Sequence, residues 1–334
     1  MNITKLELFI DTLLNEYDRE WPWCSLGIIK GNELILKKSY WYANIENSIL
    51  CSEHTNFRLA SLTKQFTAIC VLDLLDKNSI DLHDSIWRYL TEFVNNPDIT
   101  IYHLLTHTSG LLDYEDIMTN HRTNPISDRE VLQILSQQKK HKFTPWTHRS
   151  YNNWGYCILK ELIEKISNIS YWEYLEQYIF NPFGMNTSTL SIRDSSPITH
   201  RAIGYSILDK SFIMTDNDLT SLTMWDGSIY SSVYDLSQRI IKRTTILPST
   251  IIKLAEQCHT TTNEKDIYYG LWLFITTLSW YKMLFHWGSS IGFRTGMCYL
   301  PEKELGVIFL SNYNGNEGSI FTQHILTYLL NNLM

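Results

Sequence analysis

Residues 57–68 read FRLASLTKQFTA and continue as ICVLDLL to residue 75. A helix over this stretch carries apolar side chains on nearly every side, so we expect it to be buried. Ser61 and Lys64 stand at its beginning, and residues three apart share one face of a helix. Ser61 lies at the positive end of the helix dipole. Burial favours the neutral form of the Lys64 amine, which can then act as a base toward Ser61.

The Ser-x-x-Lys pattern occurs at two other places, and neither fits this chemistry. Ser136 and Lys139 lie at the end of a predicted helix that runs into KKHK, which is typical of a solvated helix end. Ser279 and Lys282 read as strand, in which residues three apart face opposite ways. The pair in the buried helix is therefore the one predicted to share a proton.

Two short motifs further along the chain supply the other parts of an acyl-transfer site. Tyr151-Asn152-Asn153 offers a phenol that can move a proton and an amide that can hold a substrate. His286-Trp287-Gly288 reads as part of a strand whose main-chain N–H groups can stabilise an oxyanion. A nucleophile, proton carriers and an oxyanion donor are the requirements of acyl transfer.

These three motifs, in this order, resemble the serine β-lactamase and penicillin-binding-protein superfamily, and most closely its class C-like members. The similarity also includes residues 99–111, ITIYHLLTHTSGL, and residues 300–312, and it extends from about residue 25 to about residue 312. Four matching segments in the right order are far more specific than any one of them.

Strand patterns at both chain ends and helix patterns between them predict an α+β fold (an α/β sandwich). The resemblance implies the same fold, with a five-stranded antiparallel sheet built from both termini, terminal helices on one face and an inserted all-helical subdomain. We expect residues 1–334 to form a single catalytic domain. The sheet is expected from about residues 1–60 and 265–334, and the mostly helical part from about residues 61–240.

The resemblance assigns catalytic roles to a small set of residues. Ser61 is the expected acyl nucleophile, and Lys64 and Tyr151 are expected to carry its proton. Which of the two is the acylation base stays open, and Tyr151 could instead be a buried residue at a helix start. The main-chain N–H groups of Ser61 and Ser289 are the expected oxyanion hole.

The resemblance also implies a set of substrate-binding residues, namely Asn153, His286, Gly288 and Arg294. His286 occupies the position where penicillin-binding relatives carry Lys. A neutral imidazole binds a carboxylate less well than an ammonium does, and it gains charge only as the pH falls. His286 therefore favours the esterase, amidase and D-aminopeptidase branches, unless it only braces its strand. Arg58 and Arg294 either anchor a substrate carboxylate or pair with acids inside the fold.

The predicted function is that of a serine hydrolase that acts through a Ser61 acyl-enzyme on an ester or amide. A D-amino-acid peptide or a β-lactam-like compound fits this chemistry. One alternative is an acyltransferase that uses the same acyl-enzyme. The other is a non-catalytic binding protein on the hydrolase scaffold. No cofactor is expected, and the predicted partner is a small-molecule or short-peptide substrate.

Composition limits the possible partners. The net charge of −7, without any basic block, argues against nucleic acid binding. No apolar run is long enough to span a bilayer, and the N-terminus does not read as a signal peptide. We therefore expect a cytoplasmic protein, or an exported one if the sequence is a mature form. The oligomeric state stays open.

Two other sets of residues bear on metal binding and on disulfide bonds. His103 and His107 have the spacing of zinc ligands, but no Glu follows His103 and no third ligand is evident. We predict no metal site. The six cysteines show no paired spacing, which favours reduced thiols over disulfides.

Overall fold

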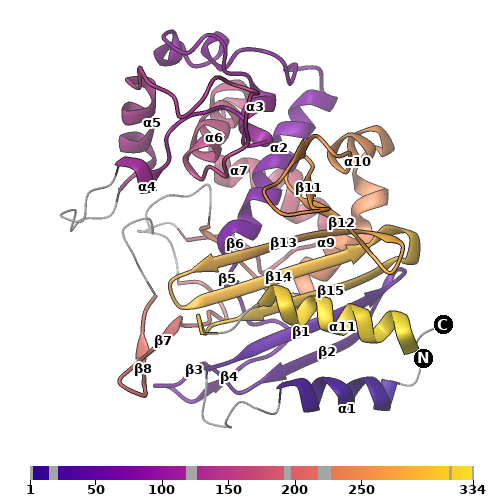
Figure 1. The fold of residues 1–334 in the computed structure, drawn as a ribbon. Helices are drawn as coiled ribbons and strands as arrows, with labels where there is room; N and C mark the ends of the chain where they lie inside the picture. The colour runs from indigo at the N-terminus through magenta and orange to yellow at the C-terminus, as the bar shows by residue number, and fades with distance from the viewer. Residues whose placement is uncertain are drawn as a thin grey trace.

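The computed structural model of this chain describes residues 3–14, 22–117, 126–191, 197–216, 227–315 and 318–332. An antiparallel sheet of eight strands, in the order β10-β11-β12-β13-β14-β15-β1-β2, forms its centre (Figure 1). The strands are β1 (Cys24–Lys30), β2 (Glu33–Tyr40), β10 (Thr260–Thr261), β11 (Tyr268–Tyr269), β12 (Phe274–Leu278), β13 (Tyr281–Ser290), β14 (Phe293–Leu300) and β15 (Leu305–Ser311).

The five longest strands come from both ends of the chain, as the sequence predicted. Strand β1, from the N-terminal part, pairs with β15, from the C-terminal part, with Cys24 opposite Ser311 and Lys30 opposite Leu305. The sheet is wider than five strands because β12, β11 and β10 extend it beyond β13. The strand predicted through Ser279 is wrong at that point, because Ser279 and Trp280 form the turn between β12 and β13 with φ of 47° and 74°.

The terminal helices α1 (Ile3–Leu14) and α11 (Gly318–Asn332) lie together on one face of the sheet (Figure 1). Leu6, Ile10 and Leu14 recur on one side of α1 and are buried. This is the amphipathic pattern expected of a helix that covers a sheet. The apolar side of the sheet and both helices form one hydrophobic core.

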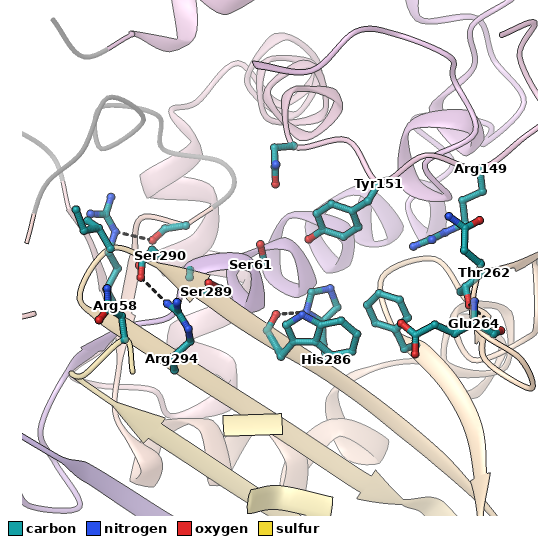
Figure 2. Close-up of a pocket in the computed structure, with 18 residues that line it drawn as sticks. Arg58, Ser61, Arg149, Tyr151, Thr262, Glu264, His286, Ser289, Ser290 and Arg294 are labelled. Atoms are coloured by element: carbon teal, nitrogen blue, oxygen red, sulfur yellow. Dashed lines mark hydrogen bonds between the residues drawn. The ribbon is translucent and has the colours of Figure 1, made fainter. Parts of the chain in front are cut away.

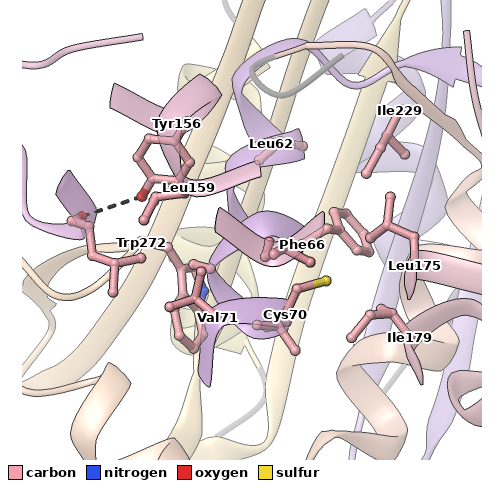
Figure 3. Packing of buried hydrophobic residues seen from close by; sticks show 14 of the residues in the cluster. Leu62, Phe66, Cys70, Val71, Tyr156, Leu159, Leu175, Ile179, Ile229 and Trp272 are labelled. Carbon is pink, nitrogen blue, oxygen red and sulfur yellow. Dashed lines mark hydrogen bonds between the residues drawn. The ribbon is translucent and has the colours of Figure 1, made fainter. Parts of the chain in front are cut away.

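Helices cover the other face of the sheet and form a second, larger core around α2 (Lys64–Asp76). Residues 64–72 of α2 are all buried, which confirms the prediction of a helix enclosed on every side. Figure 3 shows Phe66, Cys70 and Val71 of α2 among side chains from other elements. The expected helix start at Ser61 is a 3-10 turn, η1 (Ala60–Thr63), and the α-helical geometry begins at Lys64.

The remaining helices, turns and small strands complete the fold. The helices are α3 (Ile101–Leu105), α4 (Tyr114–Ile117), α5 (Asp128–Ser136), α6 (Trp154–Ser167), α7 (Tyr171–Leu175), α8 (Asn181–Phe183), α9 (Val233–Ile246) and α10 (Ser249–Ala255). Short turns are η2 (Ile86–Arg88), η3 (Thr91–Phe93), η4 (Glu176–Phe180) and η5 (Pro301–Lys303). The small strands are β3 (Tyr42–Asn44), β4 (Ile49–Leu50), β5 (Phe57–Arg58), β6 (Thr189–Leu190), β7 (Tyr205–Leu208), β8 (Ser211–Met214) and β9 (Ile229–Ser231).

Two further findings bear on the sequence predictions. All six cysteines lie in the described residues and are free thiols. Within the same residues, we find no helix whose length and apolar character would let it cross a membrane.

Candidate active site

A cavity of about 650 Å³ opens between β13 and the helical part of the molecule (Figure 2). It brings together most of the residues predicted for the site. Those that line it are Ser61, Tyr151, Asn153, His286, Ser289 and Arg294. Lys64 lies beneath the cavity, completely shielded from solvent, and Gly288 is not among the lining residues.

The turn that carries Ser61 is held from two sides. The Leu59 carbonyl accepts a hydrogen bond from Thr295 Oγ1 of β14 at 2.9 Å, and the Leu59 N–H donates to the Ile229 carbonyl of β9 at 2.8 Å. Ala60 then adopts a φ of 50°, a left-handed conformation that costs a residue with a Cβ about 1–2 kcal/mol. The surrounding strands hold the backbone in this shape, which places Ser61 at the cavity floor.

Lys64 connects Ser61 to the Tyr151-Asn152-Asn153 motif. Its Nζ donates to Ser61 Oγ at 3.2 Å and to Asn153 Oδ1 at 2.8 Å. The same Nζ lies 5.1 Å from the ring centroid of Tyr151 and 5.7 Å from that of Tyr156. A buried amine in contact with a serine hydroxyl is suited to exchange a proton with it.

Tyr151 precedes α6 by three residues, and its phenol oxygen points toward Ser61 in Figure 2. The ring of His107 packs on the ring of Tyr151 with centroids 4.3 Å apart. His107 is itself fixed, because its Nδ1 accepts from the Asn152 N–H at 3.1 Å and its Nε2 lies 3.2 Å from the Tyr269 hydroxyl. Tyr151 therefore stands in a rigid aromatic setting and faces the nucleophile.

Asp113 is a site residue that the sequence motifs did not indicate. Its carboxylate accepts from the main-chain N–H of Asn153 at 2.7 Å, from that of Trp154 at 3.2 Å and from Asn153 Nδ2 at 3.2 Å. These bonds cap the N-terminus of α6. Because Nδ2 is held by Asp113, the Asn153 Oδ1 atom faces Lys64. Asp113 thus orients the amide that contacts the buried amine.

Asn152 has a supporting role beside this network. Its Nδ2 donates to the carbonyls of Leu111 and Leu112 at 2.8 and 3.1 Å, and its Oδ1 accepts from the Gly155 N–H at 2.6 Å. It is buried and joins the start of α6 to the loop that carries Asp113.

Gly288 controls how closely β13 approaches the nucleophile turn. A Cβ at this position would lie 2.2 Å from the Leu59 carbonyl oxygen and 2.4 Å from Thr295 Oγ1. Both distances are too short for any side chain, so only glycine lets the strand pack against η1. This close approach brings the following residue, Ser289, to the cavity beside Ser61.

His286 is buried in the cavity wall and is 2% exposed. Its Nδ1 donates to the Trp287 carbonyl at 2.7 Å, and its Nε2 meets no polar partner in the described part of the chain. Burial, with a smaller contribution from the Lys64 ammonium, lowers the pKa of His286 to about 3. The imidazole is therefore neutral, and the charge expected in mild acid does not form. Its free Nε2 can accept a hydrogen bond but cannot pair with a carboxylate.

Arg149 is a second residue that the motifs did not indicate. It lines the cavity, and its guanidinium carbon lies 4.5 Å from the Tyr269 ring centroid and 5.5 Å from that of Phe274. Its Nε and Nη2 atoms have no hydrogen-bond partner among the described residues. Burial lowers the pKa of Arg149, although a guanidinium stays charged near neutral pH. Arg149 therefore brings positive charge to the cavity.

Arg58 and Arg294 lie at the opposite end of the cavity from Arg149 (Figure 2). Arg58 donates to the main-chain carbonyls of Gly227 and Asp216 at 3.0 and 3.3 Å. Arg294 donates to the carbonyls of Ser290 and Phe293 at 2.9 and 2.8 Å. Both side chains thus support the loops at this end while they border the cavity.

His103 and His107 do not face one another across a metal position. His103 Nδ1 accepts from the Thr100 N–H at 3.2 Å as part of a helix cap, whereas His107 belongs to the Tyr151 setting. No cluster of three or more His, Cys, Asp or Glu side chains suited to a metal occurs in the part of the chain that the structure describes.

Comparison with known proteins identifies the family. The Beta-lactamase family model matches residues 13–328. The chain belongs to this family. This membership confirms the resemblance seen in the sequence and supports a serine hydrolase at the level of the family.

Individual relatives are consistent with this assignment. Protein flp from Staphylococcus aureus is 26% identical over 96% of this chain, which spans 66% of that protein's length. A D-aminopeptidase from Gluconobacter oxydans is 26% identical over 87% of this chain, and the match spans 56% of the enzyme. The chain thus matches only part of each of these longer relatives.

Solved structures share the fold. The octameric penicillin-binding protein homologue from Pyrococcus abyssi superposes with a TM-score of 0.87 at 28% identity, over 99% of this chain and 78% of that one. A penicillin-binding protein from Bacillus halodurans gives a TM-score of 0.79 at 25% identity, over 93% of this chain and 95% of its own. The predicted fold class is confirmed.

Proposed function

We propose that this chain is a serine hydrolase that cleaves an ester or amide through an acyl-enzyme on Ser61. The observation that carries the proposal is the hydrogen-bonded series from Ser61 Oγ to Lys64 Nζ and on to Asn153 Oδ1 beneath the cavity floor. A serine hydroxyl is a weak nucleophile by itself and needs an adjacent base. Here the base candidates are Lys64, whose Nζ bonds to this hydroxyl, and Tyr151, which lines the same cavity and lies beside Lys64.

In the proposed reaction, Ser61 Oγ attacks the substrate carbonyl while its proton passes to the Lys64–Tyr151 pair. The pair then protonates the leaving alcohol or amine as the carbonyl re-forms, which leaves the acyl group on Ser61. Water attacks this ester, the pair takes its proton, and the acid product departs as Ser61 Oγ is reprotonated. The main-chain N–H groups of Ser61 and Ser289 are the proposed oxyanion donors, and each such donor is worth about 2.7–4 kcal/mol.

The cavity walls suggest the kind of substrate. Arg149 at one end and Arg58 and Arg294 at the other outnumber the carboxylate of Glu264, which also lines the cavity, so a short peptide or small ester with a negative group is favoured. His286 is neutral and offers an acceptor instead of a charge at the position beside Trp287. The D-aminopeptidase among the relatives makes short peptides that begin with a D-amino acid and end in a carboxylate the first substrates to test.

A covalent label tests the proposal directly. A fluorophosphonate probe should add its phosphonyl group to Ser61, as read by mass spectrometry of the digested protein, and Ser61→Ala should lose both the label and the turnover of p-nitrophenyl esters. The matched control is Ser136→Ala, because Ser136 belongs to a Ser-x-x-Lys pair on α5, away from the cavity, and its hydroxyl bonds only to the Gln133 carbonyl nearby. Equal ester turnover by wild type and Ser61→Ala would overturn the proposal. If a new ester is released when an alcohol is added, the proposed activity would be acyl transfer to the alcohol instead of hydrolysis.

A further inference from the structure

A second cavity, of about 50 Å³, lies between α2, α9 and the strands β12–β14. It shares no lining residue with the cleft at Ser61. Most of its lining is apolar and comes from Ile69, Phe183, Ile240, Leu247, Ile252, Leu273, Leu284 and Met297. The other lining residues carry polar groups, and they are Gln65, Arg239, Arg243, Glu256, Trp272 and Tyr299.

Arg239 of α9 is the main polar group of this cavity, and the side chain is buried, with 8% exposure. Its Nη1 lies 3.9 Å from the sulfur of Met297, and its guanidinium carbon lies 5.2 Å from the ring centroid of Phe66. Among the described residues, the Nε atom of Arg239 has no hydrogen-bond partner, and the Arg239 guanidinium forms no ion pair. A guanidinium carries five N–H donors, and a buried charge without a counter-charge is strongly unfavourable.

The neighbouring charges do not neutralise Arg239. Arg243, one turn further along α9, pairs with Glu256, and Lys282 Nζ lies 3.9 Å from the other carboxylate oxygen of Glu256. One carboxylate therefore serves two cations, and Arg239 adds a third. Burial, and then the nearby charge of Arg243, lower the pKa of Arg239 to about 9.

Two other polar side chains are turned toward the same space. Trp272 Nε1 is buried without an acceptor among the described residues and adds another donor. Gln65 lines the cavity beside it, with its Oε1 buried and without a donor in the described part of the chain. A rotation of the Gln65 amide by 180° exchanges its oxygen and its nitrogen, so Gln65 can present an N–H to the cavity as well. The cavity thus has a cation without an ion pair, an indole N–H and an amide, and the carboxylate among its described lining residues, Glu256, already serves Arg243 and Lys282.

We infer that this cavity binds a small monovalent anion, such as chloride, nitrate or formate, as the counter-ion of Arg239. A water needs about 10–15 Å³ of cavity volume on the same measure, so a space of about 50 Å³ is large enough for an anion of this size and small for a sugar acid such as gluconate. A bound anion would bridge α9, the start of β12 and Gln65 on α2. Because Gln65 follows Lys64, the anion would also fix the helix that carries the buried amine. This inference does not depend on the proposed hydrolase activity.

Thermal unfolding in different anions tests the inference. At constant ionic strength, chloride, nitrate or formate should raise the melting temperature saturably, by about 2 °C at ten times the dissociation constant. Gluconate is too large for the cavity and should not raise the melting temperature. Arg239→Met should lose the response to the small anions and should be at least as stable as wild type in gluconate, because the uncompensated charge is gone. Arg88→Met removes an exposed arginine that pairs with Asp84, and it should respond as wild type does.

A second measurement keeps the test decisive if Arg239→Met does not fold. Crystals of the wild-type protein grown or soaked in bromide should show an anomalous peak within hydrogen-bond distance of the Arg239 guanidinium and Trp272 Nε1. Ordered water without bromide at this position would overturn the inference. A rise in melting temperature that is equal in chloride and gluconate, or that persists in Arg239→Met, would also overturn it.

Discussion

The two walls of the cleft at Ser61 are built on different principles. The helical wall carries a continuous polar series, from Ser61 through Lys64 and Asn153 to the carboxylate of Asp113. The sheet wall carries a neutral histidine, whose Nδ1 bonds to the Trp287 carbonyl, and a glycine pressed against the nucleophile turn. Proton transfer is therefore expected to depend on the helical wall. The distance between the two walls is expected to depend on the sheet wall.

The largest effect is expected from the proton carriers of the helical wall. Lys64→Ala and Tyr151→Phe should each lower kcat by about 10²–10⁴-fold, which is the usual contribution of a positioned acid or base. If the two act as one unit, the double variant should lose hardly more than the worse single variant. Steady-state kinetics on one ester for all four proteins measures this. Two losses that simply multiply would mean that Lys64 and Tyr151 act independently.

The next effect concerns the spacing set by the sheet wall. Gly288→Ala places a methyl group 2.2 Å from the Leu59 carbonyl oxygen, so β13 must move away from the turn that carries Ser61. A displacement of this kind costs about 10²-fold in rate and, as overpacking, about 1–3 kcal/mol of stability. Kinetics and urea unfolding give the two values. Gly306→Ala is the control, because the nearest atom to its Cβ is the Tyr299 ring at 3.2 Å. Unchanged activity in Gly288→Ala would show that the spacing is not critical.

A smaller effect is expected from the far end of the helical series. Asp113→Asn keeps the shape of the side chain but removes the charge that holds two main-chain N–H groups and the Asn153 amide. Loss of a helix cap costs about 0.5–2 kcal/mol, and we expect a fall in kcat of roughly tenfold because Asn153 is then free to turn from Lys64. Asp235→Asn is the comparison, because Asp235 is buried on α9 and its carboxylate also accepts from a main-chain N–H, that of Thr187 at 2.9 Å. A loss of stability alone, with kcat unchanged, would limit Asp113 to a structural role.

These contrasts also show what a sequence can reveal. Ser61, Lys64 and Tyr151 were predictable because each belongs to a short local motif on or beside a helix. Asp113 was not, because it meets Asn153 across 40 residues through the packing of two loops. Arg149 lacked a signal for the same reason, since its aromatic partners Tyr269 and Phe274 come from the far end of the chain.

The limits of the fold prediction have a similar origin. The five long strands follow clear apolar patterns, whereas β10 and β11 have two residues each and form only because β12 offers an edge. The 3-10 turn before α2 depends on the left-handed backbone of Ala60, which neighbouring strands impose. Long-range packing, and not local preference, decides these features.

The smallest effect on rate is expected from His286, because its contribution concerns the pH dependence of stability. Its pKa is about 3 in the folded protein because burial and Lys64 oppose its charge, against about 6.5 when unfolded. Between these values the unfolded chain binds a proton that the folded chain does not. Stability is therefore lost as the pH falls from about 6.5 toward 3, by up to about 1.4 kcal/mol per pH unit. The buried His107 contributes in the same direction, because burial and then Arg149 lower its pKa as well.

His286→Asn should remove one of these two contributions, so its free energy of unfolding should fall less steeply than that of wild type between pH 7 and pH 5. Urea unfolding at several pH values gives both slopes, and the exposed His54→Asn is the control that should keep the wild-type slope. Over the same range, the preference of the wild-type enzyme for carboxylate-bearing over neutral esters should stay constant, because no imidazolium forms. Parallel unfolding curves for wild type and His286→Asn would show that His286 already carries its proton in the folded state. The sheet wall would then carry the charge of the His286 imidazolium, and it would no longer differ from the helical wall by being neutral.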